Sequence, residues 1–286
     1  MDDRRSELKK IIMDTKTLPT LPGVINKLNA LSNDDRSSVQ EMARIVSTDQ
    51  VLSARILRLA NSPSYGFYRV STISNAMILL GVNVVKSLAL SSSIFEIMEK
   101  NSVGLWEHSL GTATAANIIA RKLSLPEVEE IATAGLLHDI GKVIIGLKCA
   151  DQTQRIRSLV QTDELYVSEA ERAVLDTDHA EVGGWLSKSW YLPDKLCEPI
   201  SCHHNVAASG DHRIKTSVVH LADVLVKAAG FGHSGDQYIP AIQPLAWETL
   251  RLNEKLLEEI VLDFEDKLVE VRNFSMELQG ANVSPA

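Results

Sequence analysis

The spacing of apolar residues constrains the fold of this chain more than any other feature of its sequence. Apolar side chains recur three or four residues apart along most of the chain, as in Leu52, Ile56 and Leu59, which is the period of an amphipathic helix. Alternation with a period of two is rare, and no Asn-Gly or Asp-Gly pair joins two alternating runs as in a β-hairpin. Glycine and proline interrupt the pattern where helices would end or begin, at Pro19, Pro22, Pro63, Gly81, Pro126, Gly141, Pro193 and Pro199. The sequence therefore predicts an all-α protein of many short helices.

The composition fits a globular helical body. The chain has 286 residues, of which 45% are hydrophobic and 23% charged, so it can bury a large core and is not disordered throughout. Aromatic residues make up only 5%, which suits aliphatic packing between helices better than a β-sandwich.

Charge and cysteine content exclude several classes of partner and compartment. The formal net charge of −8 argues against nucleic acid or an anionic membrane as a partner. The three cysteines, Cys149, Cys197 and Cys202, form no CxxC pair, so reduced thiols are expected rather than disulfides. The first ten residues are charged, and the apolar stretches are shorter than the roughly 20 residues of a membrane span. We therefore expect a cytoplasmic protein.

The histidines divide the chain into two parts. All eight lie after residue 98, and clustered histidines are what a metal site requires. We therefore expect an N-terminal helical subdomain at 1–97, a helical subdomain with metal-ligand residues at 98–275, and a flexible tail at 276–286.

The most informative segment is Leu136-Leu137-His138-Asp139-Ile140-Gly141-Lys142. Here two ionisable residues directly follow an apolar helix, and adjacent helical residues point about 100° apart, so His138 and Asp139 could face one site. Gly141 is expected to end or bend the helix and to let a ligand approach the backbone. An isolated His-Asp pair would mean little, because such pairs also occur without function.

Further histidines and acids lie in other helical segments, so four or more helices could project them into a common cavity. They are His108, the pair Asp178-His179, the pair His203-His204, and His220 with Asp223, three residues apart on one helix face. Mixed imidazole and carboxylate ligands suit divalent iron, manganese, zinc or nickel. Two such ions about 3.5–4 Å apart would supply hydroxide near neutral pH for attack on a phosphoester. Lys142, one turn after His138, could carry positive charge to a substrate phosphate.

Each residue also has a structural interpretation. His108 or His179 alone could be a satisfied helix histidine, and His203-His204 could be favoured by a helix dipole. Asp223 could be a buried ion-pair partner, and Lys142 a charge near a helix end. The whole set could also form a buried hydrogen-bond network without metal, which interatomic distances would distinguish.

These residues resemble the HD superfamily of metal-dependent phosphohydrolases. The resemblance lies in His108, His138-Asp139 and Asp223, and His179, His203 and His204 are similar to second-metal ligands of its HD-GYP branch, which hydrolyses cyclic di-GMP. It implies a divalent transition-metal site, with two ions bridged by Asp139, and all seven residues as ligands. It further implies catalytic roles for Asp139 and for Lys142, which would face the substrate phosphate.

The N-terminal part resembles a different branch of this superfamily, the HDOD family. The resemblance runs from about residue 18 to about residue 225 and rests on Leu18-Pro19-Thr20-Leu21-Pro22, Asp49-Gln50-Val51-Leu52, Arg58-Leu59-Ala60-Asn61-Ser62, Ile73-Ser74-Asn75-Ala76 and Leu79-Leu80-Gly81. It implies an N-terminal helical bundle packed on an HD-type helical core, in a bacterial signalling protein.

Two positions depart from the HD-GYP pattern. The Gly-Tyr-Pro element is replaced by Val143-Ile144-Ile145-Gly146-Leu147-Lys148, and the glutamate often found four residues before the first histidine is Gly104. HDOD members resemble non-catalytic relatives that frequently lose ligands, yet this chain keeps the set. We therefore predict a signalling or regulatory protein with a metal-binding core that binds a nucleotide, a cyclic dinucleotide or a signalling protein. The alternative is an active metal-dependent phosphohydrolase or phosphodiesterase.

Overall fold

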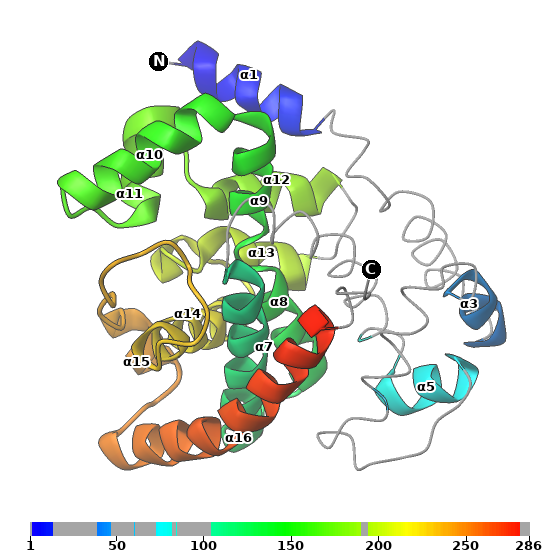
Figure 1. The fold of residues 1–286 in the computed structure, drawn as a ribbon. Coiled ribbons are helices and arrows are strands. Elements are labelled where there is room, and N and C mark those ends of the chain that lie inside the picture. The colour runs from blue at the N-terminus through cyan, green and yellow to red at the C-terminus, as the bar shows by residue number, and fades with distance from the viewer. Residues whose placement is uncertain are drawn as a thin grey trace. The chain divides into compact units, whose positions relative to one another are not determined.

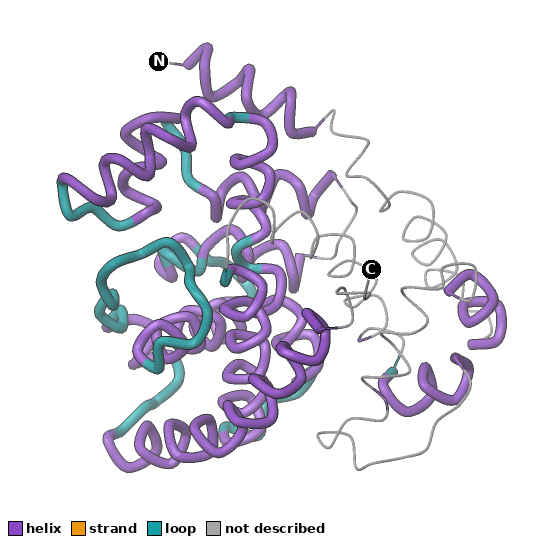
Figure 2. Tube along the Cα trace, in the orientation of Figure 1, coloured by secondary structure: helices purple, strands orange, loops and turns teal. Residues whose placement is uncertain are grey.

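The structure is a computed structural model, and within the residues that it describes every regular element is a helix (Figures 1 and 2). This confirms the all-α prediction. The described residues are 2–13, 39–46, 60, 73–81, 84, 104–189 and 194–280.

The chain divides into two compact units. The larger combines Met1–Thr15 with Ile97–Val271, and the smaller combines Lys16–Glu96 with Arg272–Ala286. The subdomain limits expected from the sequence stay predictions. The helix α1 (Asp2–Met13) contacts α12 (His179–Ser189) within the larger unit.

In the smaller unit, α3 (Val39–Val46) packs against α5 (Ile73–Leu80) through buried apolar side chains such as Met42 and Met77. Gly81 follows α5 with a φ of 81°, and its N–H donates to the Met77 carbonyl over 2.9 Å. Glycine adopts this left-handed conformation without strain, so Gly81 ends the helix as its position predicted. The motifs at 18–22, 49–52 and 58–62 lie outside the described residues, apart from Ala60.

The larger unit begins with α1 and continues as a series of helices, most of them joined by short loops (Figure 1). They are α7 (Leu105–Lys122), α8 (Val128–Leu137), α9 (Ile140–Lys148), α10 (Ala150–Thr162), α11 (Val167–Leu175), α12, α13 (Asp194–Cys202), the 3-10 turn η2 (Val206–Ala208), α14 (Arg213–Ala228), α15 (Pro244–Thr249) and α16 (Glu254–Gly280), of which the residues up to Val271 belong to this unit. The segment 229–243, between α14 and α15, contains no helix. The expected tail overlaps the end of α16, and residues 281–286 are outside the described part.

The main core of this unit is aliphatic. Buried side chains of α7, α8, α14 and α16 meet there, including Ile119, Ile131, Leu221 and Phe264. Alanines on α7 and α14 also belong to this cluster, and their small side chains let the helices approach closely. Phe231, from the loop after α14, completes the cluster and anchors that loop.

Two glycines bring α9, α12 and α13 into close contact. A Cβ atom on Gly141 would lie 1.9 Å from the carbonyl oxygen of His179, and one on Gly184 would lie 2.5 Å from the Cβ of Ser201. Any larger residue would push these helices apart. The helix end or bend predicted at Gly141 instead lies at His138 and Asp139, between α8 and α9, because Gly141 is in the first turn of α9. The backbone that approaches Gly141 belongs to α12.

None of the described helices is both long enough and apolar enough to cross a membrane.

Candidate metal centre

All seven predicted ligand residues lie at or near helix ends, or on the inner face of α14, in the larger unit. Six are buried and His204 is half-buried. Their positions are His108 in the first turn of α7, His138 and Asp139 between α8 and α9, His179 at the start of α12, His203 and His204 directly after α13, and Asp223 on α14. Residues spread over more than one hundred positions of the chain therefore gather in one region.

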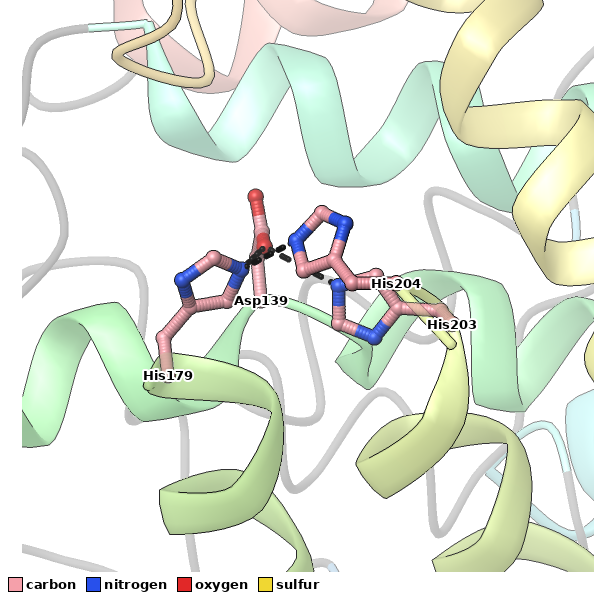
Figure 3. A group of neighbouring side chains, drawn as sticks. All are labelled: Asp139, His179, His203 and His204. Carbon is pink, nitrogen blue, oxygen red and sulfur yellow. Dashed lines mark hydrogen bonds and ion pairs between the residues drawn. The ribbon is translucent and has the colours of Figure 1, made fainter. Parts of the chain in front are cut away.

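One group of potential ligands consists of Asp139, His179, His203 and His204, whose ligand atoms all lie within 4.8 Å of one another. Figure 3 shows the three imidazoles arranged around the Asp139 carboxylate. The Oδ1 atom of Asp139 lies 3.2 Å from His179 Nε2 and 3.8 Å from His203 Nε2. The Nε2 atoms of His204 and His179 are 2.8 Å apart, so the two rings face the same point.

A second group consists of His108, His138 and Asp223, also within 4.8 Å. Asp223 Oδ1 lies 3.0 Å from His108 Nε2 and 3.6 Å from His138 Nε2. Asp139 faces this group too, because its Oδ2 atom is 3.7 Å from His108 Nε2 and 3.4 Å from His138 Nε2. Asp139 thus presents one carboxylate oxygen to each group, and each group could hold a metal ion.

Among the residues that the structure describes, five of the potential ligand atoms are buried and find no hydrogen-bond partner: His108 Nε2, His138 Nε2, His203 Nε2, Asp139 Oδ1 and Asp223 Oδ1. His108 Nε2 and Asp223 Oδ1 are 3.0 Å apart, but this contact has the distance of an ion pair without the full geometry of a hydrogen bond. Buried polar atoms in native proteins nearly always have partners, and a closed hydrogen-bond network would have satisfied these. Atoms directed at a common point without bonding each other fit a metal ion better.

Backbone carbonyls orient two of the imidazoles. The Nδ1 atoms of His138 and His203 lie 2.8 Å from the carbonyl oxygens of Gly135 and Ile200. A carbonyl oxygen can only accept a hydrogen bond, so each Nδ1 carries the proton and each Nε2 keeps its lone pair for the site. Metal-ligating histidines are commonly held in this way.

Two lysines neutralise the carboxylates. Lys142 Nζ donates to Asp139 Oδ2 and to the Ser234 carbonyl, each over 2.8 Å. Lys227 Nζ lies 2.9 Å from Asp223 Oδ2 and 2.8 Å from Asp236 Oδ2. Lys227 was not predicted, although its place four residues after Asp223 on a helix was a signal for an ion pair.

The charges nearby keep both ligand carboxylates ionised. Burial alone would raise the pKa of Asp139, but His138, Lys142 and His179 outweigh it and hold that pKa well below its usual range. Burial also opposes ionisation of Asp223, where Lys227 and His108 hold the pKa well below its usual range.

Burial keeps most of the histidines of the site uncharged. It lowers the pKa of His108, and it holds those of His203 and His204 well below the usual value, so these rings are neutral and each could act as a ligand. His179 differs: burial disfavours its charge, but the Glu171 carboxylate outweighs burial and raises the pKa to about 9.

Glu171, on α11, is a functional candidate that sequence analysis did not find. Its Oε2 atom lies 2.5 Å from His179 Nδ1 and accepts the His179 backbone N–H over 2.8 Å. A signal was present, because Glu171 lies on the apolar face formed by Val167, Ala170 and Val174. A carboxylate on such a face is rarely buried without a partner.

His220 shares its helix with Asp223 but has a different role. Its Nδ1 donates to the His203 carbonyl over 2.9 Å, and its Nε2 accepts the Gln243 backbone N–H over 3.0 Å. Both ring nitrogens are therefore engaged, and His220 positions the turn that carries His203.

The backbone of the loop after α14 contacts Gly104, just before α7. Gly104 has a φ of 86°, and its carbonyl accepts the N–H groups of His108 and His233 over 3.1 and 2.8 Å. A Cβ atom at Gly104 would lie 2.9 Å from the His233 nitrogen. A glutamate side chain at position 104 would displace this loop. Both groups of potential ligands, at Asp139 and at Asp223, therefore form without the glutamate that is often found there in HD-GYP proteins.

Comparison with known proteins agrees with this architecture. A solved HDOD domain protein of unknown function from Geobacter sulfurreducens is 27% identical, with a TM-score of 0.78 over 97% of this chain and 98% of that chain. A structure from Marinobacter aquaeolei VT8, described provisionally as a signal transduction protein, has a TM-score of 0.78 at 20% identity over 97% of this chain and 65% of that chain, which shows a shared fold.

An uncharacterized protein of Treponema pallidum (strain Nichols) is 21% identical over 216 residues, 73% of this chain. The matched region is 42% of that protein, so the chain spans about two fifths of the length of this curated relative. The family model of the HDOD domain matches residues 18–206, more than half of the chain. The HD-type helical fold expected from the sequence is thereby confirmed, and the chain belongs to the HDOD domain family.

Proposed function

We propose that this chain is a signalling or regulatory protein whose HD core holds two divalent transition-metal ions. One position would use His179, His203, His204 and Asp139 Oδ1, and the other His108, His138, Asp223 and Asp139 Oδ2. The metal-loaded core would recognise a nucleotide, a cyclic dinucleotide or a partner protein. The signalling role is supported by membership of the HDOD family and by the provisional description of the Marinobacter protein.

The observation that carries the metal proposal is the set of five buried ligand atoms without hydrogen-bond partners. Imidazole and carboxylate donors suit iron, manganese, zinc or nickel. When bound, such ions lower the pKa of coordinated water and polarise phosphoester oxygens. The chain's own contribution is to orient the imidazoles, to hold the two aspartates ionised, and to place a buried ammonium group, that of Lys142, against Asp139.

Elemental analysis of the purified full chain tests the metal proposal. We expect about two transition-metal ions per chain, and loss of both in Asp139→Ala, because Asp139 faces both groups. The matched control is Asp211→Ala, an exposed aspartate outside the site, which should retain the metal. Purified protein that takes up no transition metal, even after incubation with manganese or iron, would refute the proposal.

The second candidate function is a metal-dependent phosphohydrolase. It is favoured by one observation, the placement of Asp139 between two ligand groups with the Lys142 ammonium group 2.8 Å away. Paired metal positions with a shared carboxylate and an adjacent cation suit attack of hydroxide on a phosphoester.

Assays on metal-loaded protein separate the two functions. Phosphodiesterase and nucleotidase substrates, tested with manganese or iron, should give turnover that disappears in Asp139→Ala if the chain is an enzyme. Binding of a nucleotide or cyclic dinucleotide at full metal occupancy, without turnover of any substrate, would support the regulatory function instead.

A further inference from the structure

Glu171 contacts the metal centre from outside the ligand set. Glu171 is 2% exposed and lies on α11, whereas His179 begins α12. One oxygen, Oε2, receives both the backbone N–H and the ring Nδ1 of His179, over 2.8 and 2.5 Å. A buried carboxylate that binds two atoms of one histidine fixes both the position of that residue and the rotation of its ring.

The contact with Nδ1 has a chemical consequence for the other ring nitrogen. An ionised carboxylate only accepts hydrogen bonds, so the proton of neutral His179 resides on Nδ1 and the lone pair on Nε2. His179 Nε2 lies 3.2 Å from Asp139 Oδ1 and 2.8 Å from His204 Nε2, at the centre of its group. The negative charge also makes the imidazole a stronger electron-pair donor, as in other carboxylate–histidine–metal arrangements.

In the described part of the chain, a carboxylate supports an imidazole of one metal position, and no such contact is seen at the other. In the group of His108, His138 and Asp223, the imidazole of His138 is held by a neutral carbonyl, and Asp223 is paired with the cation of Lys227. Within the described residues, Glu171 hydrogen-bonds to His179 alone. Loss of Glu171 should therefore affect the two positions unequally.

We infer that Glu171 is a positioning residue that selectively strengthens metal binding at the position formed by Asp139, His179, His203 and His204. The inference rests on the proposed metal-binding function. The alternative role for Glu171 is purely structural, since its bond to the His179 N–H also satisfies the start of α12.

The test uses the chelator-treated full chain, titrated with manganese by calorimetry, with bound metal counted by elemental analysis. Glu171→Gln keeps an oxygen acceptor but removes the charge, and Glu171→Ala removes both. The control is Glu169→Gln, because Glu169 is exposed on the same helix and its carboxylate accepts the Tyr166 N–H rather than contacting the site.

We expect Glu171→Gln to weaken one of the two manganese sites by roughly 10- to 100-fold and to leave the other unchanged. Glu171→Ala should weaken the same site further, and Glu169→Gln should bind as the wild type. If Glu171→Ala does not fold, the titration of Glu171→Gln alone tests the inference. Unchanged affinities in Glu171→Gln, or an equal loss at both sites, would overturn the inference.

A double-mutant cycle identifies the position. In a His108→Ala background, the remaining ion occupies the His179 position. Adding Glu171→Gln should then weaken the binding of this ion by the same factor as Glu171→Gln does in the wild type. In a His179→Ala background, adding Glu171→Gln should leave the remaining affinity unchanged, and a further loss there would show a general structural effect. Wild-type protein that binds no manganese would instead refute the proposed function itself, a distinguishable result.

Discussion

Individual charges decide how this site remains stable without metal. Lys227 is buried between Asp223 and Asp236, with its ammonium group within 3 Å of both carboxylates. Asp236 in turn accepts the backbone N–H of Val167, the first residue of α11, over 2.7 Å. One lysine therefore neutralises a ligand residue and, through Asp236, connects it to the helix that carries Glu171.

Removing the Lys227 charge should leave two buried carboxylates without a cation. We expect Lys227→Met to lower the free energy of unfolding of the metal-free protein by about 3–5 kcal/mol. Lys195→Met is the control, because Lys195 is partly exposed and its partners Glu127 and Glu130 also pair with Lys215, so this substitution should cost less than about 1 kcal/mol. Urea unfolding measures both, and equal losses in the two variants would contradict this assignment.

The histidine pKa values predict the pH dependence of the metal-free protein. In the folded state, burial holds the pKa values of His203 and His204 below the usual 6.5. As the pH drops below 6.5, these two histidines take up protons in the unfolded state before they do so in the folded state, so the free energy of unfolding decreases. The pKa of His179 is raised to about 9, so its contribution is complete below 6.5 and is lost as the pH rises to about 9. Urea midpoints of chelator-treated protein between pH 5 and 9 should show both declines. His179→Asn should remove the alkaline one, and a persistent alkaline decline would contradict the assignment to His179.

At the level of helices, close packing places the ligands. The contact of α9 with α12 at Gly141 brings His179 to Asp139, and the contact of α12 with α13 at Gly184 brings the turn with His203 to the same point. Each helix contributes its ligand at an end, where the backbone leaves the helical path. The site is thus an outcome of how three helices pack.

A single methyl group should test this packing. Gly141→Ala would place a Cβ 1.9 Å from the His179 carbonyl oxygen. We therefore expect the free energy of unfolding to fall by about 1–3 kcal/mol and metal binding to weaken. Gly210→Ala is the control, because a Cβ there meets only Glu198 Oε2 at 3.5 Å. Thermal unfolding and manganese titration measure the effects. Wild-type metal affinity in Gly141→Ala would show that the helix contact does not position His179.

The sequence could predict the helices and the ligand residue types, but not every contact around them. His138 and Asp139 directly follow an apolar helix, and helix geometry alone predicted that both side chains could point toward the same site. Gly141 was misread as a helix end because local punctuation rules do not reveal that a second helix passes at that point. Glu171 was missed because it is eight residues from His179 and on another helix, and only its place on an apolar face distinguished it.

On the scale of the whole molecule, the proposed ions link two parts of the larger unit. The helices around the aliphatic core carry His108, His138 and Asp223, on α7, after α8 and on α14. The segment of α12 and the turn after α13 carries His179, His203 and His204. Asp139 connects the two groups. Metal binding should therefore stabilise the fold, because ions that bind only the folded state shift the unfolding equilibrium.

Chelation should measure this linkage. Manganese at about 100 times its dissociation constant adds about 2.7 kcal/mol for one site, so the melting temperature should rise with manganese and fall with chelator. The Asp139→Ala variant should show no such shift. A melting temperature that is independent of metal in the wild type would contradict the linkage.

Anomalous X-ray diffraction from crystals of the manganese-loaded protein, recorded near the metal absorption edge, tests the central claim most directly. The account predicts two anomalous peaks, one among His179, His203 and His204 and one among His108, His138 and Asp223, with Asp139 between them. Side chains in this arrangement without an anomalous peak, or peaks only at the protein surface, would contradict it.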